Sequence, residues 1–411
     1  MSKTNKLKIL NDPIYGFITI PNTLIFDIIE HPYFQRLRRI SQMGLSAMVY
    51  PGAHHTRFHH AIGCMHLMNK AVSVLRSKGT VISDEEEQAL YLAILLHDLG
   101  HGPFSHALEH FFLKEVSHED LSLYFMQALN QEFEGQLSMA IRIFKNEYHR
   151  KFFYQLISSQ LDMDRLDYLK RDSFYTGVVE GSINSDRLIA MLSVKNDQLL
   201  IEEKGIYSIE KFLLSRRFMY WQVYFHKTGL LAEQLLLKLL QRARYLLSNG
   251  TPVKASEALY YFLVETNTKG VSSSVFIRKF AFLDDYDVWS AVKEWQFHDD
   301  FVLSSLAQMI IDRKLLKIEL SDQIFSPDYL DAIQEKTQSL EGIDATNSAY
   351  FYFTGKVSNR AYNTEFGPIN VLLKDGTIKE WLEVDVQFKS SALTQAQTKY
   401  FLCYPKEILV K

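Results

Sequence analysis

Apolar side chains recur at three- and four-residue spacing along most of this chain, and this periodicity constrains the fold more than any other feature. Leu24, Ile25 and Ile28 form one such stripe near the start of the sequence. Another helix is predicted to begin after the capping signal at Ser83 and to end at Gly100. We therefore predict a mainly α protein. The other helices that we predict in this half cover 57–78, 104–115, 118–131, 136–146, 149–159 and 163–171.

The character of the sequence changes towards the C-terminus. A long helix is predicted from about 206 to 247, with a break or kink near Gly229, and helices continue through 255–312. Short strands are expected at 195–203, 315–320, 350–353, 369–373 and 384–388, where β-rich runs are separated by turns. The division that we predict is a helical domain at 1–325, with its core at 50–175, and a smaller α+β segment at 326–411.

Composition excludes several classes of protein. The net charge of −3 argues against nucleic-acid binding through a broadly basic surface. The two cysteines, Cys64 and Cys403, cannot form a disulfide framework, and this usage fits a reducing cytoplasm. No stretch approaches the roughly 20 apolar residues that span a bilayer, and the N-terminus lacks the apolar core of a signal peptide. We expect a cytoplasmic protein without a membrane segment.

The histidines are concentrated in one part of the chain, because 11 of the 14 lie between residues 31 and 118. For His31, His54, His55 and His110 we expect ordinary surface positions. The pair His97 and Asp98 is different, because it ends an apolar helix directly before glycines. Burying these groups without partners costs several kcal/mol, whereas a metal ion satisfies both.

Imidazole and carboxylate together suit manganese, iron, zinc or magnesium, and the negative end of a helix favours a cation. In the run at 57–60, one of two adjacent rings could complete such a site, and Arg57 lies on the same helix face, where it could reach a phosphate. The run at 162–172 places Asp164, Tyr168 and Asp172 on one face of a helix. We expect Asp167 and Lys170 in that run to belong to a solvated, ion-paired surface.

A further set of polar residues follows the His–Asp pair. Histidine titrates near neutral pH and suits proton transfer to a leaving oxygen. The candidate acid and base groups are His101, His106, Glu109 and His118.

These groups, in this order, resemble the HD superfamily of metal phosphohydrolases. Within it the chain is similar to the deoxynucleoside triphosphate (dNTP) triphosphohydrolases, which include an animal enzyme with an additional SAM domain. The resemblance covers roughly residues 8–320, and it implies an HD helical core that hydrolyses a dNTP to a deoxynucleoside and inorganic triphosphate. The runs that carry it are NDPIYG (11–16), HPYFQRLRRISQMG (31–44), PGAHHTRFHHAIG (51–63), LLHDLGHGPFSH (95–106) and LDMDRLDYLKRD (161–172).

The resemblance also implies a role for individual residues. The metal-ligand positions fall on His60, His97, Asp98 and Asp164. The catalytic relay falls on His101, Glu109 and His118, with His106 as the proton donor to the leaving 5′ oxygen. The triphosphate positions fall on Arg57, Arg165 and Arg216, and the deoxyribose positions on Gln42, Tyr168, Asp172 and Tyr224.

Regulated members of this family bind a nucleotide between subunits. By resemblance we predict a homo-oligomer, dimer or tetramer, and we hypothesise that GTP or a dNTP activates it. The positions matching the regulatory contacts are Glu30, Gln35, Arg38, Arg313 and Lys317.

The sequence departs from the animal enzyme at four positions in or beside these motifs. Glu109 replaces an Asp, Arg165 a Lys, His59 a Glu, and Phe225 a Gln beside the sugar. The last two put substrate preference in doubt, not hydrolysis. Two alternatives stay open: another HD-type phosphohydrolase, such as a nucleotide phosphodiesterase or monophosphatase, and a non-catalytic nucleotide sensor. Convergence of the three arginines in space would favour a triphosphate substrate.

Overall fold

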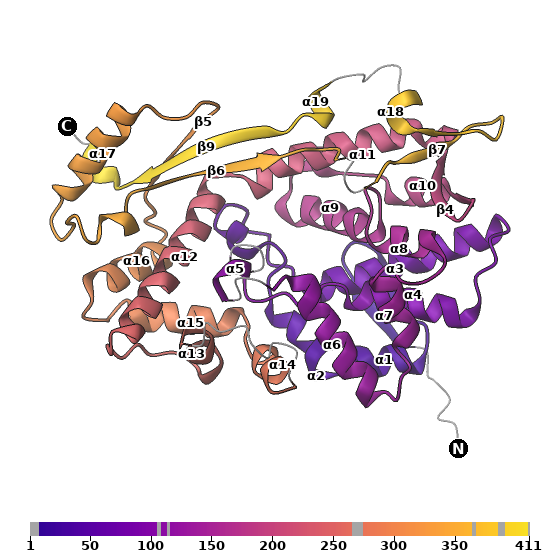
Figure 1. Ribbon diagram of the computed structural model, residues 1–411, viewed down its shortest axis with the longest axis horizontal. Coiled ribbons are helices and arrows are strands. Elements are labelled where there is room, and N and C mark those ends of the chain that lie inside the picture. The colour runs from indigo at the N-terminus through magenta and orange to yellow at the C-terminus, as the bar shows by residue number, and fades with distance from the viewer. Residues whose placement is uncertain are drawn as a thin grey trace.

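The computed structural model describes residues 8–104, 108–112, 116–264, 274–363, 367–384 and 391–409. Helices form most of the fold, and small sheets lie at its periphery (Figure 1). The mainly α class is therefore confirmed. None of the helices in the described ranges is long and apolar enough to cross a lipid bilayer.

The first half of the chain forms a helical core around the long helix α3. Its helices are α1 (Thr23–Glu30), α2 (Pro32–Gln35), α3 (Arg57–Ser77), α4 (Asp84–Leu96), α5 (Glu109–Phe112), α6 (His118–Glu132), α7 (Ser138–Phe144), α8 (Lys151–Ile157) and α9 (Met163–Thr176). The 3-10 helices η1 (Arg36–Arg39) and η2 (Gly44–Met48) lie between α2 and α3. Helix α3 packs against both α4 and α9, so residues from three separate sequence segments face one another.

Helix α4 shows how the sequence produces this core. The Ser83 hydroxyl accepts a hydrogen bond from the Glu86 amide, and the Glu86 carboxylate accepts one from the Ser83 amide, which satisfies two free donors at the helix start. From Ala89 to Leu96 every side chain is buried, so this part of the helix lies inside the core. The helix ends at His97, whose position is thus fixed by the apolar residues that precede it.

The second half continues with helices and ends in mixed structure. Its helices are α10 (Ser185–Ala190), α11 (Ile206–Met219), α12 (Lys227–Ser248), α13 (Glu257–Val264), α14 (Ser274–Ala281), α15 (Asp285–Trp295), α16 (Phe301–Ile311), α17 (Pro327–Gln338), α18 (Trp381–Val384) and α19 (Ser391–Thr394). The long helix predicted at 206–247 is interrupted by a π-helical turn, η6 (Tyr220–Tyr224). The interruption precedes Gly229 because His226 caps α12, accepting a hydrogen bond from the Thr228 amide.

Three sheets connect distant parts of the chain. β1 (Lys8–Asp12) and β2 (Gly16–Ile20) form an antiparallel hairpin. β3 (Leu192–Lys195) and β4 (Gln198–Glu202) join β7 (Asn370–Leu372) and β8 (Ile378–Glu380) in the order β3-β4-β7-β8, with β4 and β7 parallel. β5 (Lys317–Ser321) and β6 (Phe353–Asn359) flank β9 (Gln397–Tyr404), and Figure 1 shows β6 and β9 crossing above the helices.

The C-terminal strands differ in detail from the sequence prediction. A 3-10 turn at Ser348–Tyr350 precedes β6, which begins only at Phe353. Trp381–Val384 is a helical turn, and the remainder of the strand predicted at 384–388 lies outside the described residues. Two sheets contain strands from both sides of residue 325, and the division of the chain at that residue stays a prediction.

Candidate active site

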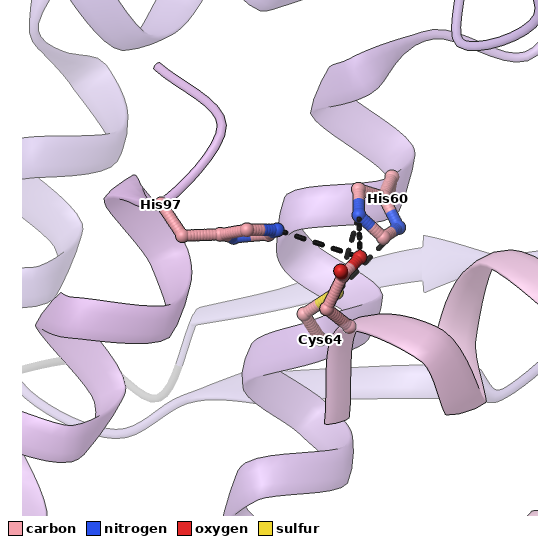
Figure 2. Close-up of side chains that lie close together, drawn as sticks. His60, Cys64 and His97 are labelled. Carbon is pink, nitrogen blue, oxygen red and sulfur yellow. Dashed lines mark hydrogen bonds and ion pairs between the residues drawn. The ribbon is translucent and has the colours of Figure 1, made fainter. Parts of the chain in front are cut away.

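Two histidines and two aspartates from α3, the end of α4, and α9 meet in the core. His60 Nε2 lies 3.1 Å from Asp164 Oδ1 and 3.6 Å from Asp98 Oδ2. His97 Nε2 lies 3.3 Å from Asp98 Oδ1 and 3.5 Å from Asp164 Oδ1. Figure 2 shows His60 and His97 reaching towards each other from separate helices. The structure thus brings together the four residues that the sequence singled out as metal ligands.

The hydrogen bonds of the two rings leave their Nε2 atoms for a cation. His97 Nδ1 lies 2.6 Å from the carbonyl oxygen of Ile94, which can only accept, so Nδ1 carries the proton. His60 Nδ1 lies 2.8 Å from Asp167 Oδ2 and donates in the same way. His97 Nε2 is buried and has no hydrogen-bond partner among the described residues. This donor set fits a divalent metal ion.

The carboxylates of the cluster are held in their charged form. Burial opposes the ionisation of Asp164, but the hydrogen bond from His60 and the charges of His97 and His60 hold its pKa well below the usual range. Burial likewise opposes ionisation of Asp98, and the charges of His97 and Arg57 hold its pKa well below the usual range. Anionic oxygens beside imidazole nitrogens are suitable ligands for manganese, iron, magnesium or zinc.

Cys64 lies one turn along α3 from His60, and sequence reasoning did not select it. Its Sγ is 3.5 Å from His60 Nδ1, and Figure 2 shows it beside the ring. Together with His60, His97 and Asp164 it offers atoms that all lie within 4.8 Å of one another. Burial raises the pKa of the Cys64 thiol, which favours the neutral form, so we do not include it among the candidate ligands.

The expectation that Asp167 lies on a solvated surface is wrong. Its side chain is fully buried, and besides the His60 ring it accepts hydrogen bonds of 2.9 and 3.0 Å from Arg171. Arg171 in turn donates to Asp12 at 2.8 Å. A Cβ on Gly63 would lie 2.1 Å from Asp167 Oδ1, so the glycine lets α9 approach α3 at this point. The spacing of Asp167 and Arg171, together with Gly63 on the facing helix, was the available signal.

Lys170, for which the same solvated, ion-paired surface was expected, is less buried than Asp167. It is half-buried, and its amino group lies 4.8 Å from the centre of the Tyr15 ring. No ion pair joins Lys170 to Asp167 among the described residues.

The surface position expected for His55 is also wrong, whereas His54 is exposed. His55 Nε2 lies 2.7 Å from Asp172 Oδ1, and its ring stacks on Tyr175. The other oxygen of Asp172 accepts a hydrogen bond of 2.7 Å from the Tyr224 hydroxyl. His55 and Tyr224 therefore fix the orientation of a carboxylate that the sequence assigned to the sugar.

A cavity of about 650 Å³ opens beside the metal-ligand cluster. All seven residues that the resemblance assigned to the substrate line it, together with His97, Asp98, His101, His118 and Asp164. Sequence reasoning did not select several other lining residues, among them Met43, Gly44, Phe104, Tyr220 and Glu233.

The three arginines that the sequence assigned to phosphates line this one cavity. Arg57 is buried and pairs with Asp98. Arg165, from the first turn of α9, pairs with Asp162 at 3.1 Å. Arg216, from α11, donates to the Gln160 side chain at 3.3 Å. The Nε atoms of Arg165 and Arg216 are buried and have no hydrogen-bond partner in the described part of the chain, so each guanidinium group keeps one unused donor.

Part of the predicted acid–base relay lies at the same cavity. His101 Nε2 is 3.4 Å from Asp98 Oδ1, and its ring stacks on that of His118 with centroids 4.0 Å apart. Burial and the charge of Arg57 lower the pKa of His101 well below its usual value. His106 and the side chain of Glu109 lie outside the described residues.

The five residues matched to a regulatory nucleotide fall into two groups. Glu30 is exposed at the end of α1, and Arg38 donates to the Gln35 side chain at 2.8 Å. Arg313 follows α16 and donates to the carbonyl of Met48, and Lys317 begins β5. No hydrogen bond or ion pair between the two groups is found among the described residues. The regulatory site stays a prediction.

Comparison with known proteins agrees with this arrangement. The HD domain family matches residues 57–172, and the HD associated region matches residues 183–261. An uncharacterized protein of Bacillus subtilis, YwfO, is 31% identical, with 99% of this chain and 94% of that protein aligned. A Dictyostelium discoideum protein named deoxynucleoside triphosphate triphosphohydrolase SAMHD1 homolog is 32% identical, over 56% of this chain and 48% of that protein.

A solved structure resembles almost the whole chain. The crystal structure of a phosphohydrolase from Bacteroides thetaiotaomicron superimposes with a TM-score of 0.94 at 48% sequence identity, covering 98% of this chain and 100% of that one. The HD domain match begins at Arg57 and ends at Asp172, and it therefore contains all four candidate metal ligands. This chain belongs to the HD-domain family of phosphohydrolases.

Proposed function

We propose that this chain is a metal-dependent dNTP triphosphohydrolase, which releases a deoxynucleoside and inorganic triphosphate. The observation that supports this substrate most strongly is the convergence of Arg57, Arg165 and Arg216 on the cavity that holds the metal-ligand cluster. A triphosphate carries about four negative charges, and three guanidinium groups beside a cation site match that charge. A monoester or a cyclic phosphodiester would not need three arginines.

In this proposal His60, His97, Asp98 and Asp164 hold a divalent ion of manganese, iron, magnesium or zinc. When bound, such an ion supplies Lewis-acid stabilisation of charge on the phosphoryl oxygens. Asp167 accepts a hydrogen bond from His60 Nδ1 and so keeps Nε2 directed at the cluster.

The other residues of the cavity would bind the phosphates, exchange protons and hold the sugar. Arg57, Arg165 and Arg216 bind the phosphate oxygens, and the stacked pair His101 and His118 exchanges protons near the reacting phosphate. We propose that the relay continues through Glu109 and that His106 protonates the leaving 5′ oxygen.

In our proposal a separate set of cavity residues holds the deoxyribose. Asp172 and Gln42 would hydrogen-bond the 3′-hydroxyl, and the Tyr168 and Tyr224 rings would pack against the deoxyribose. Asp172 is held for this purpose by His55 and Tyr224. A 2′-hydroxyl would meet the Tyr224 ring, which would disfavour ribonucleotides.

Relatives support the same reaction. The Dictyostelium protein carries the name of a dNTP triphosphohydrolase, although its alignment spans about half of each chain. We further propose, from the resemblance alone, a cytoplasmic homo-oligomer, dimer or tetramer, that GTP or a dNTP activates at Glu30, Gln35, Arg38, Arg313 and Lys317.

Product analysis tests the proposal directly. The purified protein would be incubated with manganese or magnesium and each of the four dNTPs, with and without GTP or a second dNTP. Deoxynucleoside and intact triphosphate in equal amounts would support it. Diphosphate or monophosphate products would assign the chain to another HD-type phosphohydrolase. Tight nucleotide binding without turnover, for every combination of metal, dNTP and added nucleotide, would favour a nucleotide sensor.

A further inference from the structure

Glu233 lines the substrate cavity, and its carboxylate has no hydrogen-bond or ion-pair partner in the part of the chain that the structure describes. Glu233 lies on α12, two turns after His226, and it lines the cavity. No hydrogen bond or ion pair to its side chain is found among the described residues, and no charged group contributes to its pKa shift. Burial alone raises the pKa of this carboxyl to about 7. Glu233 is half-buried in the cavity wall, and a carboxylate that is partly desolvated and lacks a partner lowers stability, so its position requires an explanation.

Glu233 lies in the part of the cavity wall where α12 comes close to η2. Asp172 follows Asp164 by eight residues on α9, which corresponds to about 12 Å along the helix. Tyr224 reaches Asp172, and the chain then leads through the turn at Phe225 into α12. Gly44, beside the Glu233 carboxylate, follows Gln42 by two residues, so Glu233 lies close to the part of the cavity that we assign to the sugar.

The surroundings of Glu233 suit a flat aromatic base. A Cβ on Gly44 would lie 3.6 Å from Glu233 Oε1 and 3.5 Å from the Phe104 carbonyl oxygen, so the carboxylate lies beside the backbone of η2. Met43, Phe104 and Phe225 supply apolar surface along the cavity. The only further group that this end leaves unpaired within the described residues is Gln42 Oε1, which is also an acceptor.

We propose that Glu233 selects guanine, with its two carboxylate oxygens accepting hydrogen bonds from the N1–H and the 2-amino group of the base. This inference rests on the proposed function and extends it to the identity of the nucleotide. Among the four DNA bases only guanine presents two adjacent donors on its Watson–Crick edge. Adenine and cytosine pair a donor with an acceptor, and thymine places one donor between two acceptors, so each sets an acceptor against an acceptor. Two charge-assisted hydrogen bonds in a buried site are among the strongest available.

The test compares kcat/KM for dGTP and dATP in the full-length protein and in Glu233→Gln. Wild type is expected to prefer dGTP by about 10- to 100-fold, the discrimination of one good bidentate pair. Glutamine presents one acceptor and one donor, which matches adenine, so the ratio should fall at least tenfold or reverse. Glu233→Asp keeps the charge and should weaken dGTP turnover while keeping the order of preference. Glu294→Gln, on an exposed surface of α15, is the matched control and should leave the ratio unchanged.

A binding measurement separates this inference from the proposed function. Calorimetric titration with deoxyguanosine and deoxyadenosine does not depend on turnover. A preference for deoxyguanosine that Glu233→Gln removes would support the base assignment even if no dNTP were hydrolysed. The inference is overturned if wild type does not prefer guanine in either measurement, or if Glu233→Gln keeps the wild-type ratio within twofold.

Discussion

At the metal-ligand end of the cavity Asp98, Asp164 and Asp167 are each paired with an imidazole or a guanidinium group. At the end beside Gly44, by contrast, Glu233 has no hydrogen bond or ion pair to any residue that the structure describes. The first arrangement compensates buried charge within the protein itself. It is therefore present before any ligand binds, and it positions the cation and phosphate groups in advance. The second arrangement leaves one carboxylate uncompensated, which lowers stability until a ligand supplies donors. The difference suggests that the chemistry is built into the fold, while nucleotide identity depends on what the cavity leaves unsatisfied.

The largest effect is expected from Asp164→Ala, which removes a candidate ligand from the paired end. Metal chemistry contributes several kcal/mol, so turnover should fall by about a thousandfold or more, and bound metal should fall with it. Activity assays and elemental analysis of the purified variant check both. His106→Ala, by contrast, should slow turnover and leave the metal content unchanged. Equal metal loss in the two variants would contradict the division of roles.

Asp167→Asn tests whether a paired carboxylate that is not itself a candidate ligand also contributes to metal binding. Losing the charge that orients His60 should weaken metal binding by about 10- to 100-fold. Metal affinity is measured by titration of the metal-free protein, and thermal unfolding is recorded because Arg171 also loses a charged partner. Asp186→Asn is the control, since that carboxylate is exposed and its one ion pair among the described residues is with Lys70 at 2.7 Å. A lower melting temperature with unchanged metal affinity would make Asp167 purely structural.

The unpaired Glu233 carboxylate should make the free energy of unfolding depend on pH. Folding raises the pKa of Glu233 from 4.5 to about 7, so between these values the folded chain binds more protons than the unfolded chain. The free energy of unfolding therefore falls as pH rises through this window, and the loss is complete above about pH 7. Glu233→Gln should be more stable than wild type by about 1–3 kcal/mol at pH 8, with a difference near zero at pH 4.5.

Denaturant unfolding of the nucleotide-free protein at several pH values measures this difference. The same difference at pH 4.5 and pH 8 would show that the Glu233 charge is already compensated, and the contrast between the two ends would then disappear.

The smallest effect is expected at Tyr224, which lies between the two ends. Tyr224→Phe removes a hydrogen bond to Asp172 worth about 1 kcal/mol, so kcat/KM for a dNTP should fall about fivefold. The ring remains, and the preference for dNTP over NTP should therefore persist. Tyr224→Ala should lower that preference, which competition assays with paired dNTP and NTP substrates would detect. An unchanged preference in the alanine variant would remove Tyr224 from sugar selection.

The sequence by itself determined the parts of the site that depend on local pattern. Apolar helix residues leading directly into His97 and Asp98 indicated a buried polar pair, and the helical spacing of Asp164, Tyr168 and Asp172 placed three cavity residues on one face. The run at 57–60 had indicated Arg57 and one of two rings, and the resemblance added the choice of His60 together with Arg165 and Arg216. The structure places all of these together.

Only the tertiary structure decided which other polar residues are buried. The i, i+4 spacing of Asp167 and Arg171 is equally typical of an ion pair on the surface, and His55 carries no local signal. Each is buried because a distant segment packs over it. In the sequence Glu233 is an ordinary glutamate on a long helix. Only in the fold does Gly44, at the start of η2, lie beside its carboxylate. Charge and periodicity are properties of neighbouring residues in sequence, whereas desolvation depends on long-range contacts, so the unpaired carboxylate became visible only in three dimensions.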